Sequence, residues 1–133
     1  MEDSLNNYSS ASLAYLGDCA LEICVREYLV REVGLSSSAK LNKAALDFVR
    51  ASKQAEAIKN ILPLLDEQEE AIFRRGRNVG HTNTPKSATV SEYRFATGME
   101  ALFGWLWLSG KHDRMTELFR AAYKLDAHAQ DKI

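Results

Sequence analysis

The chain has 133 residues, of which 46% are hydrophobic and 26% are charged, and its net charge is −1. That balance is typical of one soluble globular domain and excludes disordered, collagenous and coiled-coil chains. No 18-residue apolar run occurs, and the acidic N-terminus lacks the apolar core of a signal peptide. We therefore expect a cytoplasmic protein without membrane contact. A nucleic-acid partner would need a local basic patch, because the molecule as a whole carries no positive field.

Helical periodicity dominates the chain, and no alternating strand pattern persists. We predict an all-α fold of roughly six helices, forming one domain over residues 1–133. Asp66 and Glu69 form a capping box that starts one helix, Gly76 ends that helix, and Ser91 caps the next. The predicted helices cover about 11–33, 39–62 with a bend near Ser52, 66–75, 91–108 and 113–123.

The segment RGRNVGHTNTPKSATVS, residues 75–91, is a long polar connection. Connections longer than about 12 to 15 residues without secondary structure tend to be functional. Residues 71–91 include no acid. We expect five side chains of this region to contact RNA phosphates: Arg74, Arg75, Arg77, Asn78 and Lys86. Arginines at a helix end also complement the helix dipole, which would account for the first two of these residues alone.

A lone aspartate interrupts the apolar segment SLAYLGDCALEICV, residues 12–25. Asp18 and Glu22 are four residues apart and share one helix face. Glu22 has a simple ion-pair partner in Arg26, and Asp18 could lie at a solvated edge of the helix. Gly17 costs about 1 kcal/mol relative to Ala in a helix interior, a cost that a closely crossing helix would explain.

A second lone carboxylate lies in ATGMEALFGWLWL, residues 96–108, where Glu100 is the one charged residue. Gly98 and Gly104 flank it among large apolar side chains. We interpret the two segments as helices that cross at their glycines, so that Asp18 and Glu100 meet. Two carboxylates, together with waters and substrate phosphate oxygens, can bind Mg²⁺.

These segments carry a family resemblance. LAYLGDCALEICVREYLV resembles the signature helix of the ribonuclease III catalytic domain, built around an LGD motif, and YRFATGMEALFGWLWL resembles its second acidic helix, built around EAL. LNKAALDFVRASKQA resembles the family's intervening helices. The match is closest to mini-ribonuclease III, the bacterial branch that consists of the catalytic domain alone, and RRGRN and TPK are similar to that branch. The family's motif acids fall on Asp18 and Glu100, and its two other acidic positions fall on Ala14 and Thr97.

The resemblance implies a Mg²⁺-dependent endoribonuclease that cleaves double-stranded RNA and leaves 5′ phosphate and 3′ hydroxyl ends. Asp18 and Glu100 would be its catalytic residues and its metal ligands. The branch implies maturation of large-subunit ribosomal RNA precursors, and a ribosomal protein could act as helper. No double-stranded-RNA-binding domain is expected. RNA duplexes are recognised through shape, phosphates and 2′-hydroxyls, which suits the basic segment.

Dimerisation has an argument of its own. The run FGWLWL, residues 103–108, is apolar on every side, and a helix of that kind must be buried all round. A domain of 133 residues can bury one such helix at its centre, but the first helix is nearly as apolar. We therefore expect a partner chain, contacted by one or more of Phe103, Trp105 and Trp107. The resemblance likewise implies a homodimer whose two sites cut the two strands.

Three other functions stay open from the sequence. An inactive RNA-binding relative would explain the two absent acidic positions. An HD-type phosphohydrolase would use His81, His112, Asp113 and Asp126, although His112 and Asp113 are more simply a turn and a helix start. A helical interaction protein without chemistry would leave the two isolated carboxylates unexplained.

Overall fold

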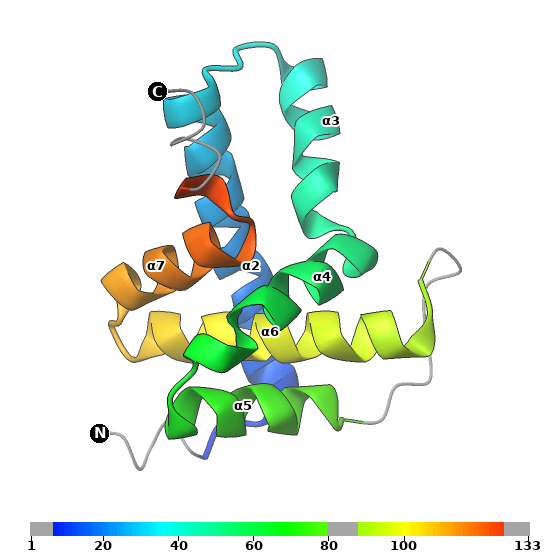
Figure 1. The fold of residues 1–133 in the computed structure, drawn as a ribbon, viewed down its shortest axis with the longest axis vertical. Helices are drawn as coiled ribbons and strands as arrows, with labels where there is room; N and C mark the ends of the chain where they lie inside the picture. The colour runs from blue at the N-terminus through cyan, green and yellow to red at the C-terminus, as the bar shows by residue number, and fades with distance from the viewer. Residues whose placement is uncertain (1–6, 80–87, 127–133) are drawn as a thin grey trace.

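The computed structural model describes residues 7–79 and 88–126, and within those ranges the chain forms six α-helices and no strand (Figure 1). A π-helical turn, Leu29–Val33, extends the first described helix, and a 3-10 turn, Leu62–Leu64, follows α4. The all-α prediction is confirmed. No described helix is both long and apolar enough to cross a membrane. The helices are α2 (Ser10–Tyr28), α3 (Ser38–Val49), α4 (Ala51–Ile61), α5 (Glu67–Arg77), α6 (Val90–Leu108) and α7 (His112–Ala122).

Helix α6 is the centre of the fold. It runs across the middle of Figure 1, with α2 crossing behind it, α4 crossing in front and α5 alongside. From Ala96 to Leu106 every residue except Glu100 is buried. Neighbouring helices therefore cover this apolar stretch of α6 on all sides. Glu100 is the one residue of the stretch that keeps part of its surface exposed.

The argument that α6 needs a partner chain is wrong for most of the FGWLWL run. Phe103 and Trp105 are buried by helices of their own chain. Trp107 and Leu108, in the last turn of α6, are the ones that keep exposed surface. One domain of this size can thus enclose one fully apolar helix.

Two capping boxes fix helix starts. The predicted box at α5 is confirmed: the Asp66 carboxylate accepts from the Glu69 amide at 2.8 Å, and the Glu69 carboxylate accepts from the Asp66 amide at 2.9 Å. The second box joins Thr89 and Glu92, at 3.0 Å and 2.9 Å, and starts α6. The prediction that Ser91 caps this helix is wrong, because the Thr89 hydroxyl already satisfies the free amide of the first turn.

The prediction that Gly76 ends a helix is also wrong. Gly76 lies inside α5 and faces α6, where an added Cβ would come within 2.8 Å of the Ala101 Cβ and 3.0 Å of the Gly98 Cα. The glycine is needed for close helix contact and not for a turn. It brings the arginines of the last turn of α5 alongside α6.

Candidate active site

Helices α2 and α6 cross with their backbones in contact. A Cβ added at Gly17 would lie 1.6 Å from the Glu100 carbonyl oxygen, and one added at Gly104 would lie 2.0 Å from the Leu13 carbonyl oxygen. No side chain fits at either position. The predicted crossing is confirmed for Gly17 and Gly104, and it sets Asp18, next to Gly17, beside Glu100. The prediction is wrong for Gly98, which faces Phe73 of α5, where an added Cβ would come within 2.7 Å of the ring.

The carboxyl groups of Asp18 and Glu100 interact directly. Asp18 is exposed, whereas Glu100 is half-buried between the helices. Burial first, and then a hydrogen bond to Asp18 and the charge of Asp18, raise the pKa of Glu100 from 4.5 to about 8. Without a cation, the pair therefore holds one proton at neutral pH.

Arg26, the one basic residue of α2, is already engaged. The Arg26 Nε donates to the Glu22 carboxylate at 2.6 Å, which confirms the simple pairing of these two residues. No basic group in the described part of the chain contributes to the pKa of Glu100. The Asp18–Glu100 pair is thus a local excess of negative charge within an apolar helix crossing.

The oxygen donors at the crossing are few. Thr97 lies where the resemblance puts a further acid, but its hydroxyl donates to the Tyr93 carbonyl oxygen at 2.9 Å. Ala14 offers no donor at all. Within residues 7–79 and 88–126, no three His, Cys, Asp or Glu side chains gather in a way that could hold a metal ion. Any cation there would rely on the two carboxylates.

A two-carboxylate site suits Mg²⁺. This ion is usually bound through one or two carboxylates, several waters and the phosphates of a substrate. The raised pKa of Glu100 shows that its ionised form lacks compensation, and a divalent cation would supply it. The residues present therefore fit the metal that the resemblance implies.

Gln54 is a site neighbour that the sequence analysis missed. Its side chain, on the first turn of α4, is buried and acts as a hydrogen-bond donor towards Glu100, which lowers the pKa of that group against the larger raising effects. A signal was available: Gln54 is the one polar member of an apolar stripe with Ile58 and Ile61, at spacings of four and seven.

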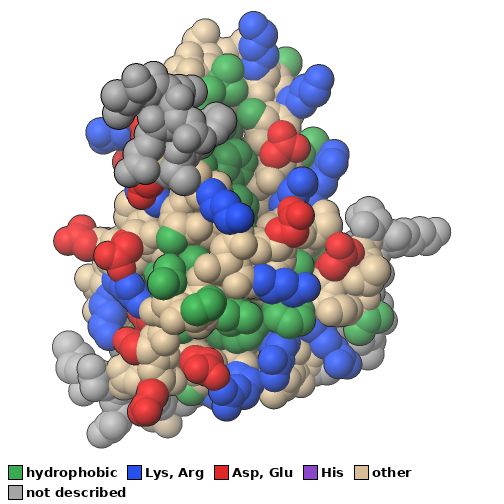
Figure 2. All heavy atoms as spheres, in the orientation of Figure 1, with side chains coloured by type: hydrophobic (Ala, Val, Ile, Leu, Met, Phe, Trp, Pro, Cys, Tyr) green, Lys and Arg blue, Asp and Glu red, His purple; other side chains and the backbone are tan. Residues whose placement is uncertain are grey.

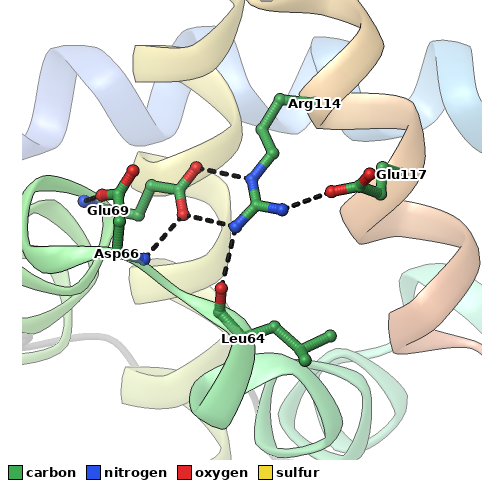
Figure 3. A network of polar contacts seen from close by, with 5 residues as sticks. All are labelled: Leu64, Asp66, Glu69, Arg114 and Glu117. Carbon is green, nitrogen blue, oxygen red and sulfur yellow. Dashed lines mark hydrogen bonds and ion pairs between the residues drawn. The ribbon is translucent and has the colours of Figure 1, made fainter.

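A second buried glutamate has a different environment. Glu69 is 1% exposed, and the Arg114 guanidinium from α7 binds both of its oxygens at 2.9 Å (Figure 3). Arg114 also donates to the Leu64 carbonyl oxygen at 2.8 Å and to Glu117. Burial alone would raise the pKa of Glu69, but the hydrogen bonds from Arg114 and the Asp66 amide hold it below the usual range. This carboxylate is fully compensated.

The described basic candidates lie in the last turn of α5 and directly after it. Arg74 forms an ion pair with Glu70, and Arg75 donates to the Tyr8 carbonyl oxygen at 3.2 Å. Lys86 lies outside the described residues. On the face seen in Figure 2, Lys and Arg side chains alternate with Asp and Glu side chains, so no single positive field covers it.

One hollow brings several polar groups of this region together. Arg77, Asn78 and Arg94 line it, the first two at the end of α5 and the third on α6. The Arg77 Nε also donates to the Asn78 side-chain oxygen at 3.2 Å. Arg94 was not a sequence candidate, because it is separated from the basic segment by the start of α6.

The residues of the HD-type alternative do not assemble. The His112 ring stacks on Trp107, with 4.3 Å between centroids. Asp126 accepts from Arg120 at 2.7 Å. His81 lies outside the described residues. Within the described residues, the contacts of His112 and Asp126 are thus with Trp107 and Arg120 and not with each other.

Comparisons with known proteins agree with the family resemblance of the motifs. A sequence model described as "Ribonuclease III domain" matches residues 11–111. The chain is 44% identical to a mini-ribonuclease 3 of Symbiobacterium thermophilum, over 84% of this chain and 85% of that protein. It is 40% identical to one of Brevibacillus brevis, over 85% and 84%. A crystal structure of a Fusobacterium nucleatum protein superposes with a TM-score of 0.79 at 32% identity, covering 90% of this chain and 95% of that one.

Proposed function

The chain belongs to the ribonuclease III family and is an endoribonuclease, and we propose that it hydrolyses double-stranded RNA with a Mg²⁺ ion held by Asp18 and Glu100. The relatives named mini-ribonuclease 3 confirm the branch that the motifs indicate. The observation that carries the proposal is the uncompensated carboxylate pair at the glycine crossing, because such a pair is stable at neutral pH only with a proton or a cation between its members.

The two carboxylates have distinct tasks in this proposal. Glu100 lies deeper and anchors the ion, and Asp18 lies at the surface, where a phosphate of the duplex can reach the same ion. When bound, Mg²⁺ lowers the pKa of a water and stabilises the charge that develops on the phosphate during in-line displacement. Glu100 would release its proton when the ion binds. The backbone contact between Gly17 and Glu100 keeps Asp18 beside Glu100. The products carry 5′ phosphate and 3′ hydroxyl ends.

The duplex would be held through its phosphates. We assign this role to Arg74, Arg75, Arg77, Asn78 and Lys86, and add Arg94 because it shares a hollow with two of them. Such contacts are independent of sequence and sensitive to salt. The proposed substrate is a large-subunit ribosomal RNA precursor, which would place the enzyme in the cytoplasm, and a ribosomal protein could present that substrate.

A homodimer is part of the proposal. Tyr15, Cys19 and Ile23 lie on the face of α2 that is turned away from the core, and Tyr15 is 86% exposed. Ile23 lines one hollow together with Trp107, so the exposed apolar surface continues onto α6. A second copy would bury this surface and place two carboxylate pairs across one duplex. Sedimentation equilibrium at micromolar concentration should return twice the mass of the chain.

The decisive experiment compares duplex and single-stranded RNA with and without Mg²⁺. We expect cleavage of the duplex in the presence of Mg²⁺ and none after chelation. Binding of duplex without cleavage under every metal condition would instead favour the inactive RNA-binding relative. Alanine at Arg77 should weaken duplex binding, whereas alanine at Lys43, an exposed residue of α3, is the surface control that separates phosphate contacts from general charge.

A further inference from the structure

The buried amide of Gln54 has one satisfied atom and one unsatisfied atom. Its Nε2 donates to the carbonyl oxygen of Val49, the last residue of α3, at 2.9 Å. Its Oε1 is buried and has no hydrogen-bond partner among the described residues. The side chain is 3% exposed, so bulk water does not replace the missing partner. A buried acceptor without a donor needs an explanation.

The orientation of this amide follows from its surroundings. A rotation that exchanged the two atoms would set Oε1 against the Val49 carbonyl oxygen, and two acceptors would then face each other. The observed orientation also lets Nε2 act as a donor towards the Glu100 carboxyl group. The unsatisfied Oε1 therefore belongs to the same amide group that faces Glu100.

The missing partner must be a hydrogen-bond donor that the protein itself does not provide. Mg²⁺ held by only two carboxylates keeps several waters, and every one of these waters donates hydrogen bonds outward. Groups that accept such bonds change metal affinity by roughly 10- to 100-fold when they are removed. Ala14 offers no such acceptor, and the Thr97 hydroxyl is bonded to its own helix.

We propose that Gln54 is a positioning residue of the cation site: its Nε2 holds the Glu100 carboxylate in place, and its Oε1 accepts a hydrogen bond from a water in the hydration shell of the ion. The inference rests on the proposed function. It accounts for the buried unsatisfied oxygen. It also gives a two-carboxylate site a third oxygen, supplied by a helix other than α2 and α6.

The test is Mg²⁺ binding to the full chain without RNA, measured by titration calorimetry. Gln54→Met keeps the size of the side chain but removes both polar atoms, and it should weaken Mg²⁺ binding about 10-fold or more. Gln54→Glu keeps an acceptor oxygen and should bind Mg²⁺ at least as tightly as the parent. Asn60→Leu is the matched control, because Asn60 lies on the same helix and donates to the Ala122 carbonyl oxygen at 2.8 Å.

The control separates positioning from stability. Gln54→Met and Asn60→Leu each lose one bond to a helix-end carbonyl group, so a purely structural role would affect both alike in thermal unfolding and neither in Mg²⁺ affinity. Parental affinity in Gln54→Met would overturn the proposal. If that variant does not fold, Gln54→Glu decides: tight binding supports the proposal, and lost binding contradicts it.

Asp18→Asn distinguishes this inference from the proposed function. If Asp18→Asn loses Mg²⁺ binding while Gln54→Met retains it, the role of Gln54 fails and the metal site stands. If Asp18→Asn binds Mg²⁺ like the parent, the proposed site itself is wrong, and the inference fails with it.

Discussion

Glu69 and Glu100 both lie in the interior of a helical domain, but they face opposite kinds of neighbour. Glu69 meets a guanidinium and a backbone amide, and its pKa is lowered. Glu100 meets a second carboxylate at the crossing where Gly17 and Gly104 bring the backbones of α2 and α6 into contact, and its pKa is raised to about 8. Burial is common to both glutamates, so burial alone does not distinguish the proposed metal site. What distinguishes Glu100 is that no basic group in its described surroundings balances its charge.

The largest expected effect is on catalysis at the uncompensated pair. Asp18→Asn and Glu100→Gln would each remove a proposed metal ligand, a contribution of several kcal/mol that corresponds to about a thousandfold or more in cleavage rate. Both variants should fold, and without metal they should be at least as stable as the parent, because the repulsion is gone. The measurement is the single-turnover rate on a duplex substrate, alongside duplex affinity. Cleavage near the parental rate in Asp18→Asn would remove this residue from the site.

The compensated glutamate should give the opposite pattern. Arg114→Met leaves the Glu69 carboxylate buried without its partner, and loss of one member of a buried pair typically costs about 3–5 kcal/mol. Urea unfolding should show this loss, whereas the cleavage rate per folded molecule should be close to that of the parent. A variant with full stability and little activity would mean that Glu69 belongs to the catalytic machinery after all.

The two glutamates also predict opposite dependences on pH in metal-free protein. The raised pKa of Glu100 means that its stabilising contribution is complete below about pH 4.5 and is lost as pH rises to about 8, at up to about 1.4 kcal/mol per pH unit. The lowered pKa of Glu69 means that its contribution is present above pH 4.5 and is lost as pH falls. The free energy of unfolding, measured in chelator from pH 3 to 9 for the parent, Glu100→Gln and Glu69→Gln, separates the contributions of the two glutamates. Parallel curves for parent and Glu100→Gln between pH 5 and 8 would contradict the assignment.

The smallest expected effect concerns the other acid of α2. Glu22 forms an exposed pair with Arg26 one turn away, and pairs of this kind contribute about 0.2–0.5 kcal/mol. Glu22→Gln should therefore change stability by less than about 0.5 kcal/mol and leave the cleavage rate unchanged. It serves as the control for Asp18→Asn, since it removes a charge from the same helix. A large loss of activity would show that Glu22 contacts the reacting groups.

The sequence was most informative where local chemistry decides the outcome. The helical periodicity, the Asp66–Glu69 box and the glycine crossing depend on short-range patterns, and the structure confirms them. Gly76 was misread because a glycine that permits helix contact and one that ends a helix look the same in sequence. Gln54 was missed because its partners, Val49 and Glu100, meet it through tertiary packing.

Phe103 and Trp105 were misjudged as dimer contacts for a related reason. Periodicity shows that a helix must be covered on all sides, but it does not show by which chain. In this fold the neighbours α2, α4, α5 and α7 already cover α6 as far as Leu106. The exposed apolar surface lies on the outer face of α2, at Tyr15 and Ile23, and at Trp107 in the last turn of α6.

The most direct test of the account is the effect of Mg²⁺ on thermal unfolding without RNA. The Asp18–Glu100 pair should make Mg²⁺ stabilising, by about 2.7 kcal/mol when the ion is at 100 times its dissociation constant. The account predicts that Mg²⁺ raises the melting temperature of the parent and of Glu69→Gln by similar amounts, and that it has no such effect on Asp18→Asn. An equal rise in Asp18→Asn, or no rise in the parent at any Mg²⁺ concentration, would contradict the claim that this pair is a cation site.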